Sequence, residues 1–306
     1  MNIIRMTGGL GNQMFQYALY LKLTALGRQV KMDDVTEYEN RNARPIMLWC
    51  FDVSYPSVTR EELNQFTDGS MQLSHRIRRK LFGRRSLEYH EQDCNFDENV
   101  LHREPAYLTG YFQSEQYFKD IEEQVRSAFS FSNKIWEELD SSLLERIKKY
   151  QRRIDESIAV SVHIRRGDYL ENEAAYGYIC TEAYYRNAID LIRSRYPEAV
   201  FFFFSNEPQW VKNWLESEFF DKFPFEIVEG TNEKNGYLDL FLMSRCKHHI
   251  IANSSFSWWG AWLNPDKEKI VIAPSKWNNK QDYKDIYTEK MTKISYDGKV
   301  IEGRFT

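Results

Sequence analysis

Two adjacent arginines at the end of an apolar segment are the residues in this chain best suited to chemistry. The segment Ile158–Ile164 is short and rich in β-branched residues, which is typical of a central strand in a parallel sheet, and Arg165 and Arg166 follow it directly. In an open α/β sheet, ligands bind outside the carboxyl ends of the strands. Because a guanidinium group matches two phosphate oxygens and stays charged at any working pH, the pair predicts a phosphate site. The alternative is that both arginines pair with surface carboxylates.

A second polar stretch stands in the same relation to a strand. We predict a strand at 249–252 and a short helix from Trp258, and between them lie Asn253, Ser254, Ser255, Phe256 and Ser257. Hydroxyl groups and backbone amides at the start of a helix suit phosphate oxygens. We therefore expect this stretch to contact the same anion as the two arginines.

Asp239 lies near the start of a helix predicted at 237–243. A carboxylate there can accept two hydrogens, from N1 and N2 of a guanine. An acid in the first turn is also favoured by the helix dipole alone, and position by itself supports that simpler explanation.

A glycine-rich turn, Thr7–Gln13, separates a strand at 2–6 from a helix that we predict to begin near Met14 and to end at Gly27. Backbone amides at such a helix start suit an anion or a sugar hydroxyl. Asn12 and Gln13 add side-chain amides that can donate to a ligand, and Gly11 beside them is a further candidate binding residue. The spacing of the glycines is not G-x-G-x-x-G, so the turn does not predict a dinucleotide site.

The elements that must position these residues alternate regularly in the second half of the chain. Strands are predicted at 158–164, 199–204, 225–228, 249–252 and 270–273, with helices at 182–195, 209–219, 237–243 and from 258. Such alternation predicts an α/β fold with a parallel sheet and helices on both faces, and it brings the polar strand ends to one crevice. We predict two domains, 1–150 and 151–306, joined by a charged helical segment at 121–153.

Composition narrows the class of protein. The 306 residues are 42% hydrophobic and 28% charged, with a net charge of −4, which fits a globular protein and argues against a broad nucleic-acid surface. The four cysteines show no metal-ligand spacing and suggest free thiols in a reducing compartment. Because the start lacks a signal-peptide pattern and no 18-residue apolar run occurs, we expect a cytoplasmic protein that does not span a membrane.

The stretch 76–85 is strongly basic and contains apolar residues between its charges. Such a segment can lie on an anionic membrane surface and bring an enzyme to a lipid-linked substrate. The alternative, which composition alone favours, is a helix face in solvent.

Three ordered motifs resemble a known family. Gly8-Gly-Leu-Gly-Asn-Gln-Met-Phe-Gln-Tyr-Ala18, His163-Ile-Arg-Arg-Gly-Asp-Tyr169 and Ala252-Asn-Ser-Ser-Phe-Ser-Trp-Trp-Gly260 resemble the bacterial α-1,2-fucosyltransferases of glycosyltransferase family 11. The resemblance implies a GT-B-like fold of two Rossmann-type domains that face a central cleft. It also implies an N-terminal acceptor side, a C-terminal site for GDP-L-fucose, and inverting transfer to the 2-hydroxyl of a terminal galactose with no required metal or other cofactor.

The resemblance also implies roles for single residues. Arg165 matches the arginine that holds the β-phosphate, Arg166 supports it, and His163 matches a histidine near the nucleotide. Asp239 resembles the aspartate that reads guanine, and Asn12 an asparagine near the reacting centre. The segment Ser255–Ser257 matches one that contacts phosphate. Many relatives have Ser-Asp-Asp or Ser-Asp-Glu where this chain has Ser205-Asn-Glu, which leaves a contact of Asn206 with the nucleotide open.

The general base and the acceptor stay open at this stage. The base candidates are Asp33, Asp34, Glu37, Asp168 and His163. The acceptor is an O-antigen repeat, a lipid-linked glycan or a free oligosaccharide, and no Asp-x-Asp occurs to hold a cation. Two other functions compete: a fucosyltransferase of the same clan with another linkage or acceptor, and a non-catalytic module that binds a sugar nucleotide or glycan.

Overall fold

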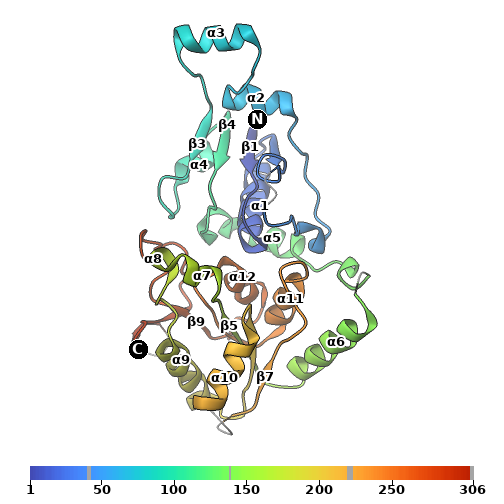
Figure 1. The fold of residues 1–306 in the computed structure, drawn as a ribbon, viewed down its shortest axis with the longest axis vertical. Helices are drawn as coiled ribbons and strands as arrows, with labels where there is room; N and C mark the ends of the chain where they lie inside the picture. Colours follow the sequence, from blue (N-terminus) through green and yellow to red (C-terminus); the bar gives the residue numbers. More distant parts are fainter. Residues whose placement is uncertain (40–42, 138, 219–222, 304–306) are drawn as a thin grey trace. The chain divides into compact units, whose positions relative to one another are not determined.

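The computed structural model describes residues 1–39, 43–137, 139–218 and 223–303. The chain forms two compact units, unit 1 (Met1–Ser130) and unit 2 (Phe131–Thr306) (Figure 1). Each unit contains its own parallel sheet with helices packed around it, so the predicted α/β class and the pair of Rossmann-type units of a GT-B-like chain are confirmed.

Unit 1 is built on a four-stranded parallel sheet in the order β2-β1-β4-β3. Its core joins Ile3 of β1 and Tyr107 of β4 to Leu63 and Phe66 of α2. The strands are β1 (Asn2–Arg5), β2 (Val30–Asp33), β3 (Glu88–His90) and β4 (Ala106–Thr109), and the helices are α1 (Leu10–Ala25), α2 (Arg60–Thr67), α3 (Leu73–Phe82), α4 (Glu98–His102) and α5 (Glu122–Ala128), with single-turn helices at Leu48–Phe51, Glu115–Tyr117 and Lys119–Ile121.

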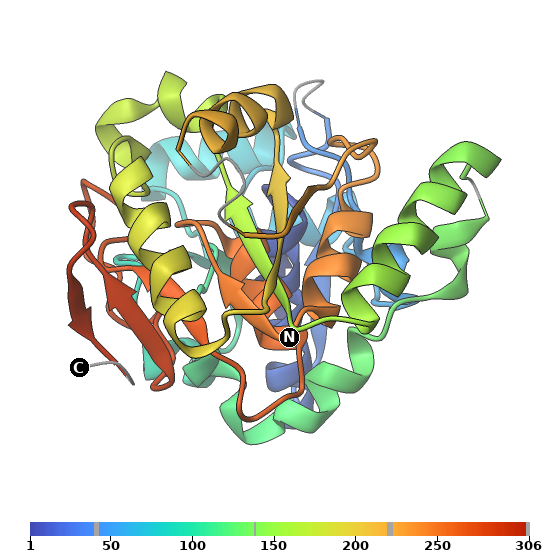
Figure 2. The ribbon, with the colours of Figure 1, turned by 90° about the horizontal axis from the view of Figure 1, so that it is seen from below.

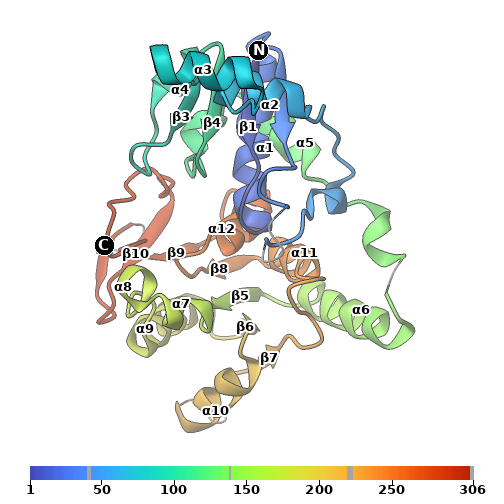
Figure 3. The same ribbon diagram turned by 45° about the horizontal axis from the view of Figure 1, so that its top comes forward.

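Unit 2 is built on a seven-stranded sheet in the order β11-β10-β9-β8-β5-β6-β7. Strand β11 is antiparallel to β10, and the other neighbouring pairs are parallel. Figure 3 shows the strands from β10 to β7 side by side in this order. The strands are β5 (Ala159–Ile164), β6 (Val200–Ser205), β7 (Phe225–Ile227), β8 (His248–Ile250), β9 (Val271–Pro274), β10 (Met291–Ile294) and β11 (Val300–Glu302). The helices are α6 (Ser141–Asp155), α7 (Asp168–Glu171), α8 (Glu173–Tyr176), α9 (Glu182–Arg195), α10 (Pro208–Glu218), α11 (Tyr237–Arg245) and α12 (Ser255–Leu263), with a single turn at Asn133–Trp136.

Strand β5 lies inside the sheet of unit 2, between β8 and β6, and all six of its residues are buried. Because side chains alternate along a strand, Val160, Val162 and Ile164 join the core beneath α9, whereas Ser161 and His163 point to the other face. On that face the Ser161 hydroxyl lies 2.8 Å from Nδ1 of His249. The predicted strand and its burial are therefore confirmed.

Helix α6 belongs to unit 2 and lies within the segment 121–153 that we expected to join two domains. Asp140 caps its start by accepting the N–H of Leu143 (2.9 Å), and the helix buries Tyr150 and Ile154. The Tyr150 hydroxyl donates to the carbonyl of Ile227 in β7 (3.0 Å). Figure 2 shows α6 alongside α11. The compact units divide after Ser130, whereas the sequence placed a boundary after residue 150.

Two helices begin earlier than their apolar spacing indicates. Helix α1 begins at Leu10 and α12 at Ser255, so the conspicuous polar residues occupy the first helical turns. Gly8 permits the early start of α1, because it adopts a left-handed φ of 76° that most side chains would disfavour. The short strands β3, β10 and β11, which carry several polar residues, were not predicted from the sequence.

In the part of the chain that the structure describes, none of the helices has the length and apolar character that crossing a membrane requires. The four cysteines, as predicted, are free thiols.

Candidate active site

The chain reverses its direction of travel across the sheet of unit 2 between β5 and β8. From β5 it adds β6 and β7 on one side, and it then returns to add β8, β9 and β10 on the other. The crevice outside the carboxyl ends at such a point is where open α/β sheets bind ligands. The loops after β5 and β8 carry the two predicted phosphate-binding motifs, so both motifs flank this point.

Arg166 braces the loop after β5. Its backbone N–H donates to Oδ1 of Asn206 (3.0 Å), its Nε donates to Oε2 of Glu207 (3.0 Å), and its guanidinium lies 3.9 Å from the ring centre of Trp210. The N–H of Gly167 donates to the other oxygen of Glu207 (2.9 Å). For Arg166 this is the pairing with a surface carboxylate that the sequence left as an alternative, so its supporting role at a phosphate stays a prediction. Asn206 also has a partner within the protein.

Arg165 lies at the tip of β5 and is half-buried. Its guanidinium carbon is 5.8 Å from the ring centre of Tyr169, and the hydroxyl of Tyr169 donates to the carbonyl of Asn253 (3.0 Å). Tyr169 therefore connects the loop after β5 to the loop after β8. Asp168 begins α7, and its side chain lies outside the described residues.

The loop after β8 is fixed by its own polar side chains. The Asn253 amide donates to the carbonyl of Trp277 (3.1 Å) and accepts from the Cys180 thiol (3.4 Å). The buried hydroxyl of Ser257 donates to the carbonyl of Ser254 (3.3 Å). The side chains of Asn253 and Ser257 therefore already have hydrogen-bond partners within the protein. Because the N-cap Ser254 makes no side-chain cap, what α12 presents is the backbone N–H groups of its first turn.

Two buried tyrosines of α9 hold the neighbouring strand ends together. The hydroxyl of Tyr185 donates to the carbonyl of His163 at the end of β5 (2.9 Å). The hydroxyl of Tyr184 donates to the carbonyl of Ile251, just after β8 (2.6 Å). The His163 ring is itself buried and lies 5.8 Å, centre to centre, from the ring of Phe256. The histidine thus packs beneath the first turn of α12.

Asp239 occupies the first turn of α11, which follows the carboxyl end of β7. Its Oδ1 is shielded from solvent and has no hydrogen-bond partner among the described residues. Burial raises the pKa of this carboxyl to about 7, and a hydrogen bond with Thr231 offsets part of that rise. A buried acceptor without a donor is costly, so the site is suited to a ligand that brings N–H groups.

In unit 1, the residues after β1 and β4 meet. Here too the neighbouring strands β1 and β4 mark the point where the chain changes direction. Asn12 and Gly11 lie in the first turn of α1, and Oδ1 of Asn12 accepts from Nε2 of Gln113 in the loop after β4 (2.8 Å). Gln113 was missed by sequence reasoning.

Gln13, predicted as a possible ligand donor, has a structural role. It is fully buried, donates to the carbonyls of Gly8 and Pro45 (both 2.9 Å) and accepts the N–H of Met47 (2.9 Å). Gln16, one turn later, likewise accepts from Thr7 and donates to Gly110. Both amides lie on the buried face of α1, so they hold loops and do not face a ligand.

Three of the base candidates also have partners within unit 1. The buried carboxylate of Asp33 accepts the N–H groups of Val35 and Thr36 and the Tyr107 hydroxyl (2.6 Å). The Asp34 carboxylate accepts the Ser57 hydroxyl (2.8 Å), and Glu37 pairs with Arg5 (2.9 Å). The structure therefore shows bracing roles for these carboxylates.

Glu91 is a further residue that sequence reasoning missed. It follows β3, and its two carboxylate oxygens accept the N–H groups of Tyr111 (2.8 Å) and Phe112 (3.1 Å) in the loop that carries Gln113. A side chain at Gly110 would lie 2.6 Å from Cβ of Glu91, so the glycine permits this approach. Burial raises the pKa of Glu91 to about 7, although the two amides oppose the rise.

Replacing Glu91 by glutamine should remove one source of pH-dependent stability. A carboxyl whose pKa is raised in the folded state contributes stability below its unfolded pKa of about 4.3, and this contribution is lost as the pH rises to about 7. Urea unfolding at pH 5, 6, 7 and 8 should show the difference in unfolding free energy between wild type and Glu91→Gln shrinking or reversing toward pH 7. A difference that stays constant with pH would contradict the assignment.

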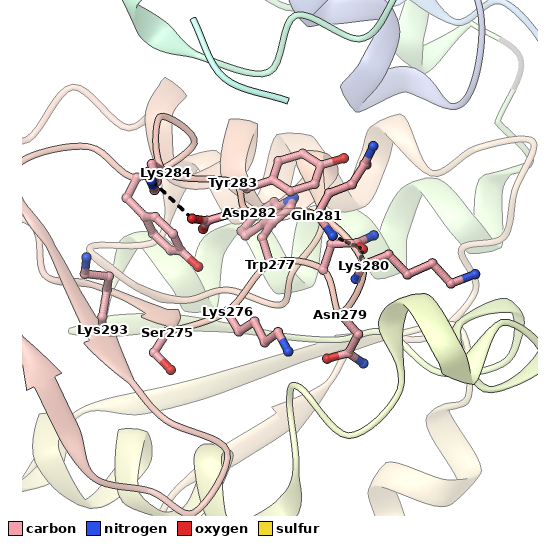
Figure 4. Close-up of a pocket in the computed structure, with 12 residues that line it drawn as sticks. Ser275, Lys276, Trp277, Asn279, Lys280, Gln281, Asp282, Tyr283, Lys284 and Lys293 are labelled. Atoms are coloured by element: carbon pink, nitrogen blue, oxygen red, sulfur yellow. Dashed lines mark hydrogen bonds and ion pairs between the residues drawn. The ribbon is translucent and has the colours of Figure 1, made fainter. Parts of the chain in front are cut away.

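A cavity of about 440 Å³ is lined mainly by the loop between β9 and β10 (Figure 4). Strand β9, which leads into this loop, is the neighbour of β8 in the sheet. The carbonyl of Trp277 in this loop accepts from Asn253, which joins the cavity loop to the loop after β8. The lining combines aromatic rings, amides and ammonium groups: Ser275, Lys276, Trp277, Asn278, Asn279, Lys280, Gln281, Asp282, Tyr283, Lys284, Tyr287 and Lys293. Such a surface suits a hydroxylated or anionic ligand.

Within the described ranges, no group of three or more His, Cys, Asp or Glu side chains is placed to hold a metal ion. That the reaction needs no metal stays a prediction.

Comparisons with known proteins agree with the sequence motifs. The chain is 31% identical over 299 residues to an alpha-1,2-colitosyltransferase of Escherichia coli, covering 92% of this chain and 93% of that protein. It is also 31% identical to the E. coli O-antigen biosynthesis glycosyltransferase WbnK, covering 90% and 95%. A galactoside alpha-(1,2)-fucosyltransferase 1 of Saimiri boliviensis boliviensis is 30% identical over 158 residues, which cover 51% of this chain and 42% of that protein.

Solved structures resemble the fold more distantly. The apo form of POFUT1 is 12% identical with a TM-score of 0.44, covering 89% of this chain and 97% of that one. The E. coli ADP-heptose lps heptosyltransferase II is 13% identical with a TM-score of 0.44, covering 96% and 90%. These likenesses are too distant to bear on function. Residues 85–296 match the model of glycosyl transferase family 11, and with the near full-length relatives this shows that the chain is a glycosyltransferase that belongs to family 11.

Proposed function

We propose that this glycosyltransferase moves L-fucose from GDP-β-L-fucose to the 2-hydroxyl of a terminal β-galactose, with inversion at the fucose C1 and without a required metal. The observation that carries the proposal is the placement of Arg165 directly after β5 and of the first turn of α12 after β8, the strand beside β5 in the sheet of unit 2. A fixed cation and a set of backbone N–H groups at one sheet edge are suited to a diphosphate.

In the proposed reaction, the acceptor oxygen forms a bond to C1 of fucose while the bond from C1 to the β-phosphate oxygen breaks. The electron pair leaves with GDP, and the hydroxyl proton passes to a base. Negative charge develops on the departing β-phosphate, so Arg165 and the α12 amides stabilise the transition state more than the ground state. This contribution replaces the cation that many sugar transferases use.

Asp239 supports a guanine nucleotide as the donor. Its buried Oδ1 has no partner among the described residues, and N1–H and N2–H of guanine supply two donors in a matching arrangement. An adenine offers no such pair of donors at that edge.

A second candidate donor is an activated colitose, because a relative that matches over nine-tenths of both chains is named a colitosyltransferase. Colitose is L-fucose without the 3-hydroxyl. The same Arg165 and α12 groups would serve either sugar, since they contact the diphosphate and not the ring.

Two further observations support a proposed acceptor and a proposed location of the enzyme in the cell. WbnK is named for O-antigen biosynthesis, which supports a galactose-terminated O-antigen or oligosaccharide acceptor. The four free thiols support a reducing, cytoplasmic compartment. Asn12, which is paired with Gln113 at the sheet edge of unit 1, is proposed to act near the reacting centre.

The test is a donor and acceptor matrix. GDP-fucose and GDP-colitose are each incubated with lactose, lacto-N-biose and N-acetyllactosamine, with and without EDTA, and products are analysed by NMR for linkage. We expect an α-1,2 product from GDP-fucose that EDTA does not reduce. A strong preference for GDP-colitose would select the second candidate. Another linkage would indicate a different specificity within the clan, and failure to release GDP with any acceptor would favour a binding module.

A further inference from the structure

Apolar side chains that are exposed to solvent concentrate in one segment of unit 1. Across the described residues, twelve large hydrophobic side chains are exposed, and five of them fall between residues 71 and 82. Those in α3 are Leu73 (70% exposed), Ile77 (50%), Leu81 (69%) and Phe82 (69%), and α3 has no buried residue at all. In Figure 1, α3 stands off the rest of its unit. A contiguous exposed apolar surface of this kind marks an interaction site.

One side of α3 is fastened to the rest of unit 1. Arg78 and Arg79 both pair with the carboxylate of Asp68, and Arg79 also donates to the carbonyls of Asp68 and Ser70 (2.9 and 2.7 Å). The N–H of Arg85 donates to the same carboxylate (2.9 Å). This hydrogen bond, with the charges of Arg78 and Arg79, lowers the pKa of Asp68, so the fastening persists at neutral pH.

The apolar stripe lies on the opposite side of the helix. Leu73, Ile77 and Leu81 recur every four residues, and at about 100° per residue their common direction is roughly 150° from that of Arg78 and Arg79. Arg76 and Lys80 flank the stripe on one side, and their side chains make no ion pair or hydrogen bond to the described residues. Because Arg78 and Arg79 hold one side of α3 against Asp68, the opposite side, which is apolar and basic, faces solvent.

We propose that this face of α3 lies on an anionic lipid bilayer, with the stripe at the level of the headgroups and the two flanking cations on lipid phosphates. Apolar residues flanked by lysine and arginine are the pattern of helices that lie in a membrane interface. A second copy of the chain fits this face less well, because like charges would meet across a symmetric contact. The chain as a whole carries a net charge of −4, whereas this face of α3 is positively charged. An anionic lipid surface attracts such a basic face. The proposal does not depend on the donor or the reaction.

The experiment measures binding of the purified full chain to vesicles by sedimentation, without donor or acceptor. We expect binding to vesicles that contain phosphatidylglycerol, weaker binding at high salt, and little binding to pure phosphatidylcholine. Arg76→Gln with Lys80→Gln should reduce partitioning about 30-fold, from roughly one kcal/mol for each cation. Ile77→Gln with Leu81→Gln should reduce it about tenfold or more.

Lys148→Gln with Lys149→Gln is the matched control, because it removes the same charge from exposed positions of α6. This control should bind as wild type does, and thermal unfolding should show that all variants stay folded. The proposal is overturned if wild type ignores phosphatidylglycerol at low salt, or if the control loses as much binding as the α3 variants. It is also overturned if wild type forms a dimer that Ile77→Gln with Leu81→Gln dissolves while vesicle binding is absent.

Discussion

Replacing Arg165 by alanine should reduce turnover by about two to three orders of magnitude while unit 2 stays folded. The guanidinium lies at the tip of β5, where negative charge develops on the departing diphosphate in the proposed reaction, and removal of one preorganised donor from such a site typically costs that much. Because the contact strengthens in the transition state, kcat should fall more than the affinity for GDP.

Two variants sharpen the test of Arg165. Arg165→Lys keeps the charge but loses the planar fork, so its turnover should lie between those of wild type and Arg165→Ala. Arg195→Ala removes an exposed arginine near the end of α9, before the start of β6, and should leave turnover unchanged. Steady-state kinetics with GDP-fucose and lactose, beside thermal unfolding, measure both properties. Near wild-type turnover of a folded Arg165→Ala would refute the assigned role.

Replacing Asp239 by asparagine should weaken GDP binding about a hundredfold and abolish its dependence on pH near 7. Hydrogen bonds to a charged group are each worth roughly 1.5–3 kcal/mol, and asparagine would turn one N–H toward the guanine. Because burial raises the pKa of Asp239 to about 7, the wild-type carboxyl is protonated below that pH and cannot accept both guanine hydrogens. Wild-type affinity for GDP should therefore rise from pH 6 to pH 8.

Calorimetric titration with GDP and with inosine diphosphate, which lacks the N2 amine, measures this contact directly. Wild type should prefer GDP, and the preference should shrink in Asp239→Asn. If both nucleotides bind the variant as tightly as they bind wild type, Asp239 does not read the base.

Residue type and order were enough to find the strands and the loops of the candidate site. The β-branched run 158–164 was predicted as a buried strand and is one, because burial on both faces leaves a continuous apolar signal. The helix starts at Leu10 and Ser255 were placed too late. The spacing of apolar residues indicates which face of a helix packs against the core. The first turns of these two helices contain few apolar residues, so the spacing does not show where they begin.

The direction in which a polar side chain points was not predictable. Gln13 and Asn12 are adjacent amides in the same turn, yet one is buried among carbonyls and the other lies at the sheet edge beside Gln113. Glu91 could not be linked to Gly110 and Phe112 because the pairing of β3 with β4, two short strands, brings them together. Neither contact leaves a periodic trace in the sequence.

The two tyrosines of α9 have a consequence for the nucleotide site that we propose in unit 2. Tyr185 donates to a carbonyl at the end of β5, and Tyr184 donates to a carbonyl just after β8. The starts of the two following loops are therefore held by the same helix. Tyr169 connects these two loops to each other, because its hydroxyl donates to the carbonyl of Asn253. The diphosphate of the proposed donor would therefore bind between loops that are already ordered. Few torsions of the protein would become fixed on binding, so little of the binding energy would be offset by lost conformational entropy.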